Sequence, residues 1–217
     1  MSDDSFFIVI EGMDGAGKTA NAWKLFDTLF HSHSGDVLLT SEPDEDSLLG
    51  DELRKALARQ ISLSPATLAQ AFAINRMSHL ESFIEPFLNC GRRIVICDRY
   101  LLSSLVYQAT EGISMGDVLA LNRWARSPDL TIFLRISPIE AATRLRRRQT
   151  EPDLFENNFA LRAEKYAAAV ALLREKGEVI VEVDADPPFP QVFDAVLSAM
   201  KGNAPDWLRI QPPLIFD

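Results

Sequence analysis

The residues most able to do chemistry form a glycine-rich loop near the start of the chain. Positions 12–19 match the pattern G-x-x-x-x-G-K-[ST]. In such a loop the backbone N–H groups surround a phosphate, Lys18 reaches the outer phosphates and Thr19 offers its hydroxyl to Mg²⁺. We therefore predict a phosphate-binding loop with these members: Gly12, Met13, Asp14, Gly15, Ala16, Gly17, Lys18 and Thr19.

The flanks of this loop are the ones that a phosphate site needs. The apolar run 6–10 predicts a buried parallel strand, and residues 20–29 carry a rough apolar helical face. The start of that helix adds unpaired N–H groups and the positive end of its dipole. A glycine turn that only joins a strand to a helix is the alternative, and the Gly-Lys-Thr ending argues against it.

A second candidate site follows another apolar run, residues 93–97. Asp98 stands at the end of this predicted strand, and in parallel sheets ligands bind at that edge. A carboxylate there can hold Mg²⁺ through water, so Thr19 and Asp98 are the predicted metal residues. Arg99 comes next and should face a different part of the cleft. An ordinary surface ion pair is the alternative reading of this Asp-Arg pair.

Composition limits the partners of the chain. It has 217 residues, of which 47% are hydrophobic, and its formal net charge is -9. An acidic chain without a basic stripe argues against a nucleic-acid polymer as partner. Positive charge is concentrated locally at Arg144 and Arg146–148. That distribution suits a small anionic ligand.

Cysteine usage points to a reducing compartment, and hydropathy argues against a membrane-spanning segment. The two cysteines, Cys90 and Cys97, form neither a disulfide framework nor a zinc motif. Residues 1–4 do not resemble a signal peptide. No apolar run approaches the roughly 20 residues needed to span a bilayer. We expect a cytoplasmic protein without a membrane partner.

Strand and helix patterns alternate along the chain, which predicts an α/β fold with a parallel sheet covered on both faces. Pro86 is expected to kink or separate the last turn of the third predicted helix. The expected strands are 6–10, 37–40, 93–97, 130–134 and 179–183. The expected helices are 20–29, 49–60, 65–88, 104–110, 118–125, 138–148, 159–176 and 191–200.

Further motifs between residues 6 and 183 closely resemble those of the thymidylate kinase family. They are the phosphate-binding loop, Phe72-Ala73-Ile74-Asn75-Arg76, Asp98-Arg99-Tyr100, Ser103-Ser104 with Tyr107-Gln108, and Pro128-Asp129-Leu130. The resemblance implies a P-loop NTPase fold: three αβα layers, a central parallel sheet of about five strands and a small helical lid. It also implies a kinase domain, which we place over residues 1–201, with the lid at about 144–157. Residues 202–217 contain three prolines, and we expect them to form a C-terminal tail.

The implied activity is phosphoryl transfer from ATP-Mg²⁺ to dTMP, giving dTDP and ADP. Family members are commonly homodimers, and the partners expected here are small nucleotides. The resemblance places Asp14 near the acceptor phosphate and 3′-hydroxyl, and Arg99 on the acceptor monophosphate. With Lys18 and the lid arginines Arg146 and Arg148, they are the expected catalytic residues. The helix end that carries these lid arginines could also be merely solvated.

The resemblance also assigns a binding site for the acceptor nucleotide. Phe72 matches an aromatic residue that stacks on thymine. Arg76 matches an arginine that hydrogen-bonds the base. Ser104 lies where the family contacts the base, Tyr107 where an aromatic favours deoxyribose, and Gln108 beside the base. Phe72 and Arg76 are one helical turn apart, which suits a flat face plus an edge hydrogen bond. From its spacing alone, Phe72 could instead be a core aromatic.

Three departures from the family pattern leave the activity open. Residues 41–46 lack an arginine that many members have, and three carboxylates at 44–46 replace a glycine-rich turn, so this loop should face away from the site or bind metal. Leu154 occupies a common arginine position in the lid, and Arg135 stands where an aspartate is common. A kinase for another nucleotide or deoxynucleoside, or a nucleotide-binding protein with little turnover, are the alternatives. The apolar content of the tail suggests docking, and a loose terminus is the alternative.

Overall fold

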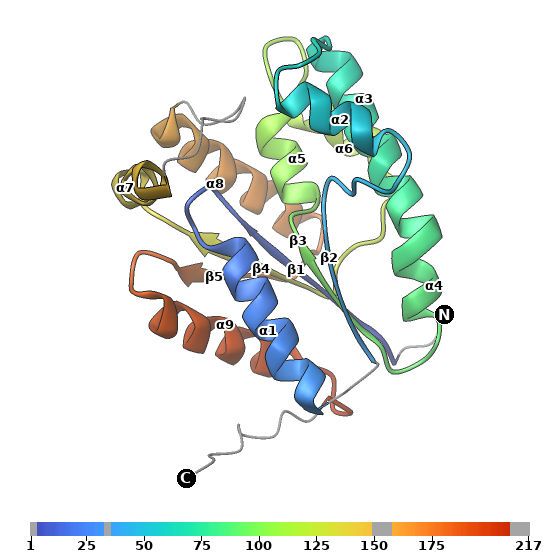
Figure 1. Cartoon of the computed structure of the whole chain (residues 1–217), viewed down its shortest axis with the longest axis vertical. Coiled ribbons are helices and arrows are strands. Elements are labelled where there is room, and N and C mark those ends of the chain that lie inside the picture. Colours follow the sequence, from blue (N-terminus) through green and yellow to red (C-terminus); the bar gives the residue numbers. More distant parts are fainter. Residues whose placement is uncertain (1–3, 33–35, 149–157, 209–217) are drawn as a thin grey trace.

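The computed structural model of the chain describes residues 4–32, 36–148 and 158–208. In this part, parallel strands form a five-stranded sheet in the order β2-β3-β1-β4-β5 (Figure 1). Helices pack on both faces of the sheet, so the predicted α/β class and the three-layer arrangement are confirmed.

Apolar runs in the sequence account for the strands. Because a parallel sheet is covered on both faces, its strands are almost continuously hydrophobic. All seven residues of β1 are buried, as are all five of β3. The strands are β1 (Phe6–Gly12), β2 (Val37–Ser41), β3 (Ile94–Asp98), β4 (Leu130–Arg135) and β5 (Ile180–Asp184). Each of the five predicted strands is present, within one or two residues.

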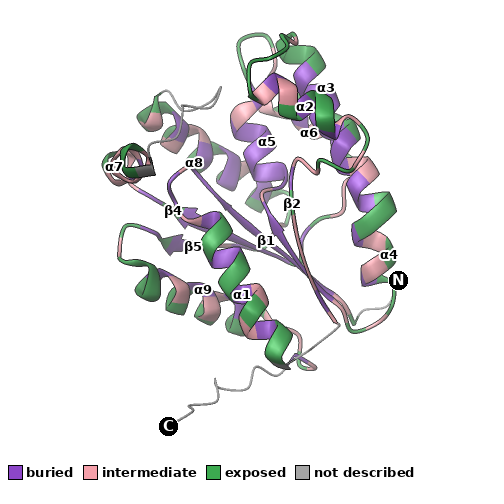
Figure 2. Ribbon diagram, in the orientation of Figure 1, coloured by how far each residue is buried: buried purple, intermediate pink, exposed green. Residues whose placement is uncertain are grey.

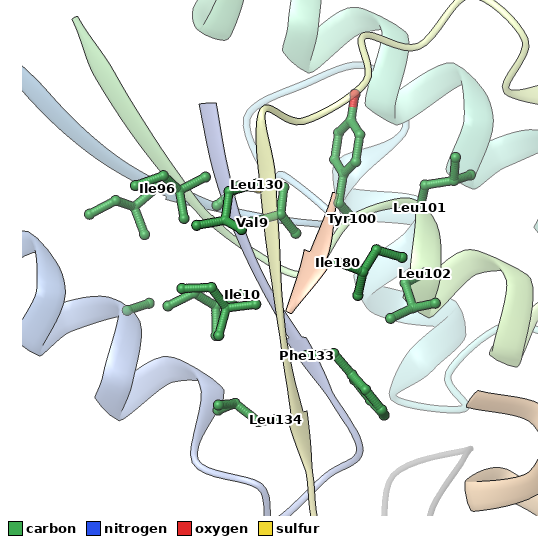
Figure 3. Packing of buried hydrophobic residues seen from close by; sticks show 14 of the residues in the cluster. Val9, Ile10, Ile96, Tyr100, Leu101, Leu102, Leu130, Phe133, Leu134 and Ile180 are labelled. Carbon is green, nitrogen blue, oxygen red and sulfur yellow. The ribbon is translucent and has the colours of Figure 1, made fainter. Parts of the chain in front are cut away.

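One face of the sheet is covered by α1 (Lys18–Ser32), which contacts β1, β2 and β3, and by α9 (Phe189–Asn203), which contacts β4 and β5. The other face carries α5 (Leu101–Tyr107) and α8 (Phe159–Glu175), which pack against each other. Figure 3 shows how alternation along β4 serves both faces: Leu134 points toward α1, and Phe133 points to the other side.

The remaining helices surround the carboxyl ends of β2 and β3 or lie at the sheet margin (Figure 1). The long predicted helix 65–88 is α3 (Pro65–His79), a π-helical turn η1 (Leu80–Ile84) and α4 (Glu85–Leu88). Pro86 lacks an N–H, and the helix changes its pitch just before it. The other helices are α2 (Gly50–Leu57), α6 (Met115–Leu121) and α7 (Pro138–Arg148).

Two helices begin earlier than expected, because hydrogen bonds at their first turn fix where they start. Helix α6 begins at Met115 rather than 118, because Ser114 and Asp117 form a reciprocal capping box. Helix α5 begins at Leu101 rather than 104, and it ends at Tyr107 rather than 110. Its first turn is held by a residue of β1, which is described below.

The core is one large cluster centred on the sheet, with a small satellite between α2 and α3. Figure 2 shows the central strands β1, β3 and β4 buried and the outer sides of the helices exposed, while the edge strands β2 and β5 are only partly buried. Helix α9 continues to Asn203, so the expected boundary at residue 201 falls inside it. Trp207 packs against the core and Leu208 is buried in it. No described helix is long and apolar enough to cross a membrane.

Replacing Ile96 by alanine tests the packing of this core. Ile96 is fully buried in β3, so Ile96→Ala should lower the free energy of unfolding by about 2–5 kcal/mol. Ile139, which is 82% exposed in α7, is the matched control, and Ile139→Ala should change it by less than about 0.5 kcal/mol. Urea unfolding followed by circular dichroism measures both. Equal effects of the two substitutions would contradict the assigned burial.

Candidate active site

The glycine-rich loop lies between β1 and α1, as the sequence predicts. Gly12 has a φ of 152°, and a Cβ there would lie 2.7 Å from the carbonyl oxygen of Leu134. Gly15 has a φ of 89°, and its Cβ would meet the Ala141 oxygen at 3.0 Å. Both positions therefore require glycine. Because α1 begins at Lys18, the loop ends on the free N–H groups of a helix.

Two predicted cations meet at one carboxylate in this loop. Arg99 forms an ion pair with Asp14 through Nη2, and the Lys18 ammonium lies 3.6 Å from the same Asp14 oxygen. Burial and the nearby Arg99 guanidinium lower the pKa of Lys18 to about 8. Burial raises the pKa of Asp14, but Arg99 and Lys18 outweigh it and bring the pKa well below its usual range. Asp14 is therefore a stable anion between two cations.

Arg99 reaches this position through an unusual backbone conformation. Its φ is 73°, in the left-handed region that a residue with a side chain rarely adopts. The Arg99 N–H donates to the Ile10 carbonyl at 3.0 Å, which ties it to β1. Its Nη1 donates to Ser103 Oγ at 3.1 Å. The conformation thus turns the guanidinium toward the phosphate loop, and strain of this kind is concentrated at functional sites.

The predicted metal pair is brought together beside the loop. The Thr19 hydroxyl donates to Asp98 Oδ2 at 2.5 Å. The other Asp98 oxygen, Oδ1, is buried and has no hydrogen-bond partner in the part of the chain that the structure describes. A hydroxyl and a carboxylate with a spare oxygen are the hard donors that Mg²⁺ takes. No cluster of three or more His, Cys, Asp or Glu that could hold a metal is found among the described residues.

All six residues predicted to bind the acceptor line one pocket next to Asp14. Its empty volume is about 470 Å³, part of it open solvent. The lining consists of Asp14, Glu42, Pro43, Leu57, Phe72, Arg76, Arg99, Tyr100, Ser103, Ser104, Tyr107 and Gln108. The structure therefore brings together residues from the phosphate loop, the loop after β2, α3, the segment after β3 and α5.

Arg76 is the buried centre of the pocket wall, only 2% exposed. Its Nε donates to Glu42 Oε2 at 2.8 Å, and Nη1 donates to Asn122 Oδ1 at 2.6 Å. Its Nη2 donates to Ser104 Oγ at 2.9 Å, and the guanidinium lies over the Tyr100 ring. The charge is thus paired and held in one orientation. Neither Glu42 nor Asn122 was predicted as a site residue.

The rest of the lining combines an apolar face with polar side chains. Phe72 is 9% exposed and packs with Leu53 and Leu68, so it belongs both to the satellite core and to the pocket lining. Gln108 is 4% exposed, and its Oε1 has no hydrogen-bond partner among the described residues. The Tyr107 hydroxyl donates to Asp14 Oδ2 at 3.1 Å. A flat ligand with polar edges matches this lining.

Sequence reasoning missed Glu11, although a charged residue inside an otherwise apolar strand was a signal. Glu11 is fully buried in β1, directly before the phosphate loop. It accepts hydrogen bonds from the N–H groups of Tyr100 and Ser103, at 2.7 and 2.8 Å, and from Ser103 Oγ at 2.6 Å. Burial raises the pKa of this carboxyl. Glu11 thereby fixes the start of α5 against the loop.

The contacts of the acidic loop over residues 41–46 bear on whether its carboxylates face the site. The Asp44 carboxylate accepts a hydrogen bond from the Ser47 hydroxyl, and the Asp44 backbone is held by Asn75. Glu45 lies 3.9 Å from Arg54. The pocket lining includes Glu42 and Pro43 but none of the residues 44–46. Of the two expectations for these three carboxylates, the contacts favour the one in which they face away.

The predicted lid is described only in part. Arg144 donates to Glu140 and to the carbonyls of Asp186 and Pro187, so it anchors α7. Arg146 is exposed near the end of α7, and Arg148 is the last residue of that helix. Residues 149–157, including Leu154, lie outside the described residues. Arg135 is exposed and faces Glu182 at 3.9 Å.

Curated relatives share much of this sequence. The chain is 38% identical over 150 residues to a protein named probable thymidylate kinase from Pyrococcus horikoshii, a match that covers 67% of this chain and 72% of the relative. It is 36% identical to a probable thymidylate kinase from Staphylothermus marinus, over 88% and 92%. It is 34% identical to a thymidylate kinase from Xanthomonas campestris pv. campestris, over 92% and 86%.

The fold has a counterpart among solved structures. A crystal structure of thymidylate kinase from Ehrlichia chaffeensis superimposes with a TM-score of 0.69 at 24% identity, covering 91% of this chain and 98% of that one. The model of the family described as Thymidylate kinase matches residues 10–196, a range that includes the phosphate loop and the whole acceptor pocket. The chain therefore belongs to the thymidylate kinase family.

Proposed function

We propose that this enzyme transfers the γ-phosphoryl group of ATP to dTMP, giving dTDP and ADP. The observation that carries the proposal is the meeting of Lys18 and Arg99 at Asp14. One cation belongs to the phosphate loop and the other borders the pocket. Two polyanions bound head to head would need this arrangement. Membership of the thymidylate kinase family supports the same donor and acceptor.

In this transfer the protein takes little part in the covalent chemistry, because the acceptor attacks the donor directly. An oxygen of the dTMP phosphate attacks the γ-phosphorus in line and forms the new P–O bond. The bond from the γ-phosphorus to the β,γ-bridging oxygen breaks, and its electron pair leaves with ADP. Lys18 and Arg99 hold the two phosphate groups in position and offset their mutual repulsion. In the absence of nucleotide, Asp14 keeps both cations in place.

A Mg²⁺ ion fits beside the loop, at Thr19 and Asp98. The spare, buried Asp98 Oδ1 and the Thr19 hydroxyl supply oxygen ligands of the type that this ion prefers. Bound there, Mg²⁺ would neutralise charge on the phosphate oxygens of ATP. The lid, at about 144–157, would bring Arg146 and Arg148 toward the transferred group, with residues 1–201 as the kinase domain and 202–217 as the tail.

Thymine fits the pocket through complementary groups. Phe72 supplies an apolar face, while the unpaired Gln108 Oε1 and the Arg76–Ser104 pair supply polar edges. Tyr107, held by Asp14, stands where the sugar would lie. The three carboxylates of residues 44–46 motivated the alternative of an unphosphorylated acceptor. Their absence from the pocket lining removes that reason to prefer it.

We also propose a homodimer in the cytoplasm. A groove along α3 and α6 is lined by apolar side chains, several of them exposed: Leu48 by 62%, Ile74 by 44% and Trp124 by 67%. Exposed apolar patches of this kind favour association. The exposed thiol of Cys90 and the buried thiol of Cys97 suit a reducing compartment.

An acceptor panel tests the proposed reaction. With ATP-Mg²⁺, ADP release should be fastest with dTMP when dTMP, dUMP, dCMP, dGMP and AMP are compared in a coupled assay. Arg99→Met should lower kcat/KM for dTMP by about 10²–10³, because it removes the cation for the acceptor phosphate. Arg92→Met is the control, since Arg92 is exposed at the opposite end of β3. No turnover with dTMP while another acceptor works would reject the assignment.

The lowered pKa of Lys18 predicts a pH dependence for ATP use. Below a pH of about 8, Lys18 is charged in the free enzyme; above it the side chain loses its proton and one contact to the phosphates. The kcat/KM for ATP should therefore fall about tenfold per pH unit above pH 8. At saturating ATP, kcat should persist to higher pH, because bound phosphates favour the charged form. A flat kcat/KM up to pH 9.5 would contradict the shift.

Substitution in the α3 groove tests the proposed dimer. Light scattering after size-exclusion chromatography should give twice the mass of one chain for the wild type. Ile74→Arg should give the mass of one chain, because it buries an unpaired charge in the interface. Ile139→Arg, at an exposed site on α7, should remain dimeric. A wild type that elutes as a single chain at micromolar concentration would refute the dimer.

A further inference from the structure

One face of α8 lies directly over the phosphate loop. The Tyr166 hydroxyl donates to the carbonyl of Gly12, the first loop residue, at 2.9 Å. The Tyr166 ring also stacks on Phe133 of β4 and meets the edge of Tyr107. Residues four apart lie on the same face of a helix, so the residue one turn before Tyr166 shares this face. That residue is Arg162.

Arg162 is buried but incompletely paired. It is 8% exposed, and its Nη1 has no hydrogen-bond partner in residues 4–32, 36–148 and 158–208. The guanidinium carbon lies 5.3 Å from the centre of the Tyr107 ring, while that of Arg99 lies 5.5 Å from the same centre. Two guanidinium groups thus share one aromatic ring at the edge of the acceptor pocket.

Among the residues that the structure describes, no carboxylate forms an ion pair with this guanidinium, and its Nη1 has no acceptor. Asp14 is the carboxylate that Arg162 affects: burial raises the Asp14 pKa, whereas Arg99, Lys18 and then Arg162 lower it. Both Asp14 oxygens are already used by other groups, Oδ1 by Arg99 and Oδ2 by the Tyr107 hydroxyl. A buried, charged N–H without an acceptor costs free energy, so its retention requires a compensating role.

We propose that Arg162 is a phosphate-contacting residue of the active site, whose Nη1 donates to an oxygen of the transferred phosphoryl group. The inference rests on the proposed kinase function for its reaction, and on the geometry of α8 for its placement. Arg146, one of the predicted lid cations, is exposed at the end of α7. Arg162, in contrast, is already buried beside the phosphate loop before any lid movement.

Kinetics and stability together test this role. Arg162→Met should lower kcat by about 10²–10³, the usual loss for one transition-state donor, while the Kd of dTMP changes by less than about threefold. Arg162→Lys should recover part of the loss, because it keeps the charge. The Tm of ligand-free Arg162→Met should equal or exceed that of wild type, because the variant removes a buried unpaired group. Arg174→Met is the control: Arg174 lies on α8 but pairs with Glu182.

Inorganic tripolyphosphate gives a readout that needs no acceptor and no turnover. Calorimetric titration with Mg²⁺-tripolyphosphate should show about tenfold weaker binding to Arg162→Met than to wild type, and equal binding to Arg174→Met. If the enzyme turns over an acceptor other than dTMP, this result still supports Arg162 while the dTMP assignment fails. Unchanged tripolyphosphate binding, or a kcat within about threefold of wild type, would overturn the role of Arg162. A lower Tm with kcat retained would identify a structural residue.

Discussion

The active site depends on a single buried carboxylate, Glu11. It stands at the end of β1 and accepts the N–H groups of Tyr100 and Ser103 at the start of α5. The phosphate loop follows Glu11 directly, and α5 carries three of the side chains that line the acceptor pocket, those of Ser103, Ser104 and Tyr107. Glu11 therefore makes one rigid unit of the two halves of the site. In phosphoryl transfer, where positioning supplies most of the catalysis, such rigidity matters more than any single reactive group.

Asp14 has a complementary role, because it is the anion that both Lys18 and Arg99 contact. Without Asp14, the buried Lys18 and the partly buried Arg99 would lose the carboxylate that both contact, which is costly. Their common ion pairs with Asp14 offset that cost and hold both side chains in place. A phosphate that enters then competes with one carboxylate for prepositioned cations. Little reorganisation is needed, which is the condition for strong electrostatic catalysis.

Local sequence was sufficient for the strands and the phosphate loop, whereas the predicted pocket residues came from the resemblance to thymidylate kinases. An apolar run or a glycine pattern is read within ten residues, and the order of such elements predicts a parallel sheet. The start of α5 was not predictable in this way, since the acceptor for its first turn, Glu11, lies 89 residues before Tyr100. The same holds for Arg76: its partners Glu42 and Asn122 are 34 and 46 residues away, so no local pattern shows them.

The pairing of Arg76 changes what the pocket can recognise. A solvated arginine would lose its hydration and side-chain freedom each time a base bound. Here Glu42, Asn122 and Ser104 have already fixed the guanidinium, and Tyr100 supports it from one face. Its charge is neutralised by Glu42, so the wall presents directed N–H and O–H groups rather than a free cation. For the nucleotide acceptor proposed above, we expect selectivity among bases to come from the fixed directions of these donors and of the Gln108 amide, because a base with mismatched edges would leave buried polar groups unpaired.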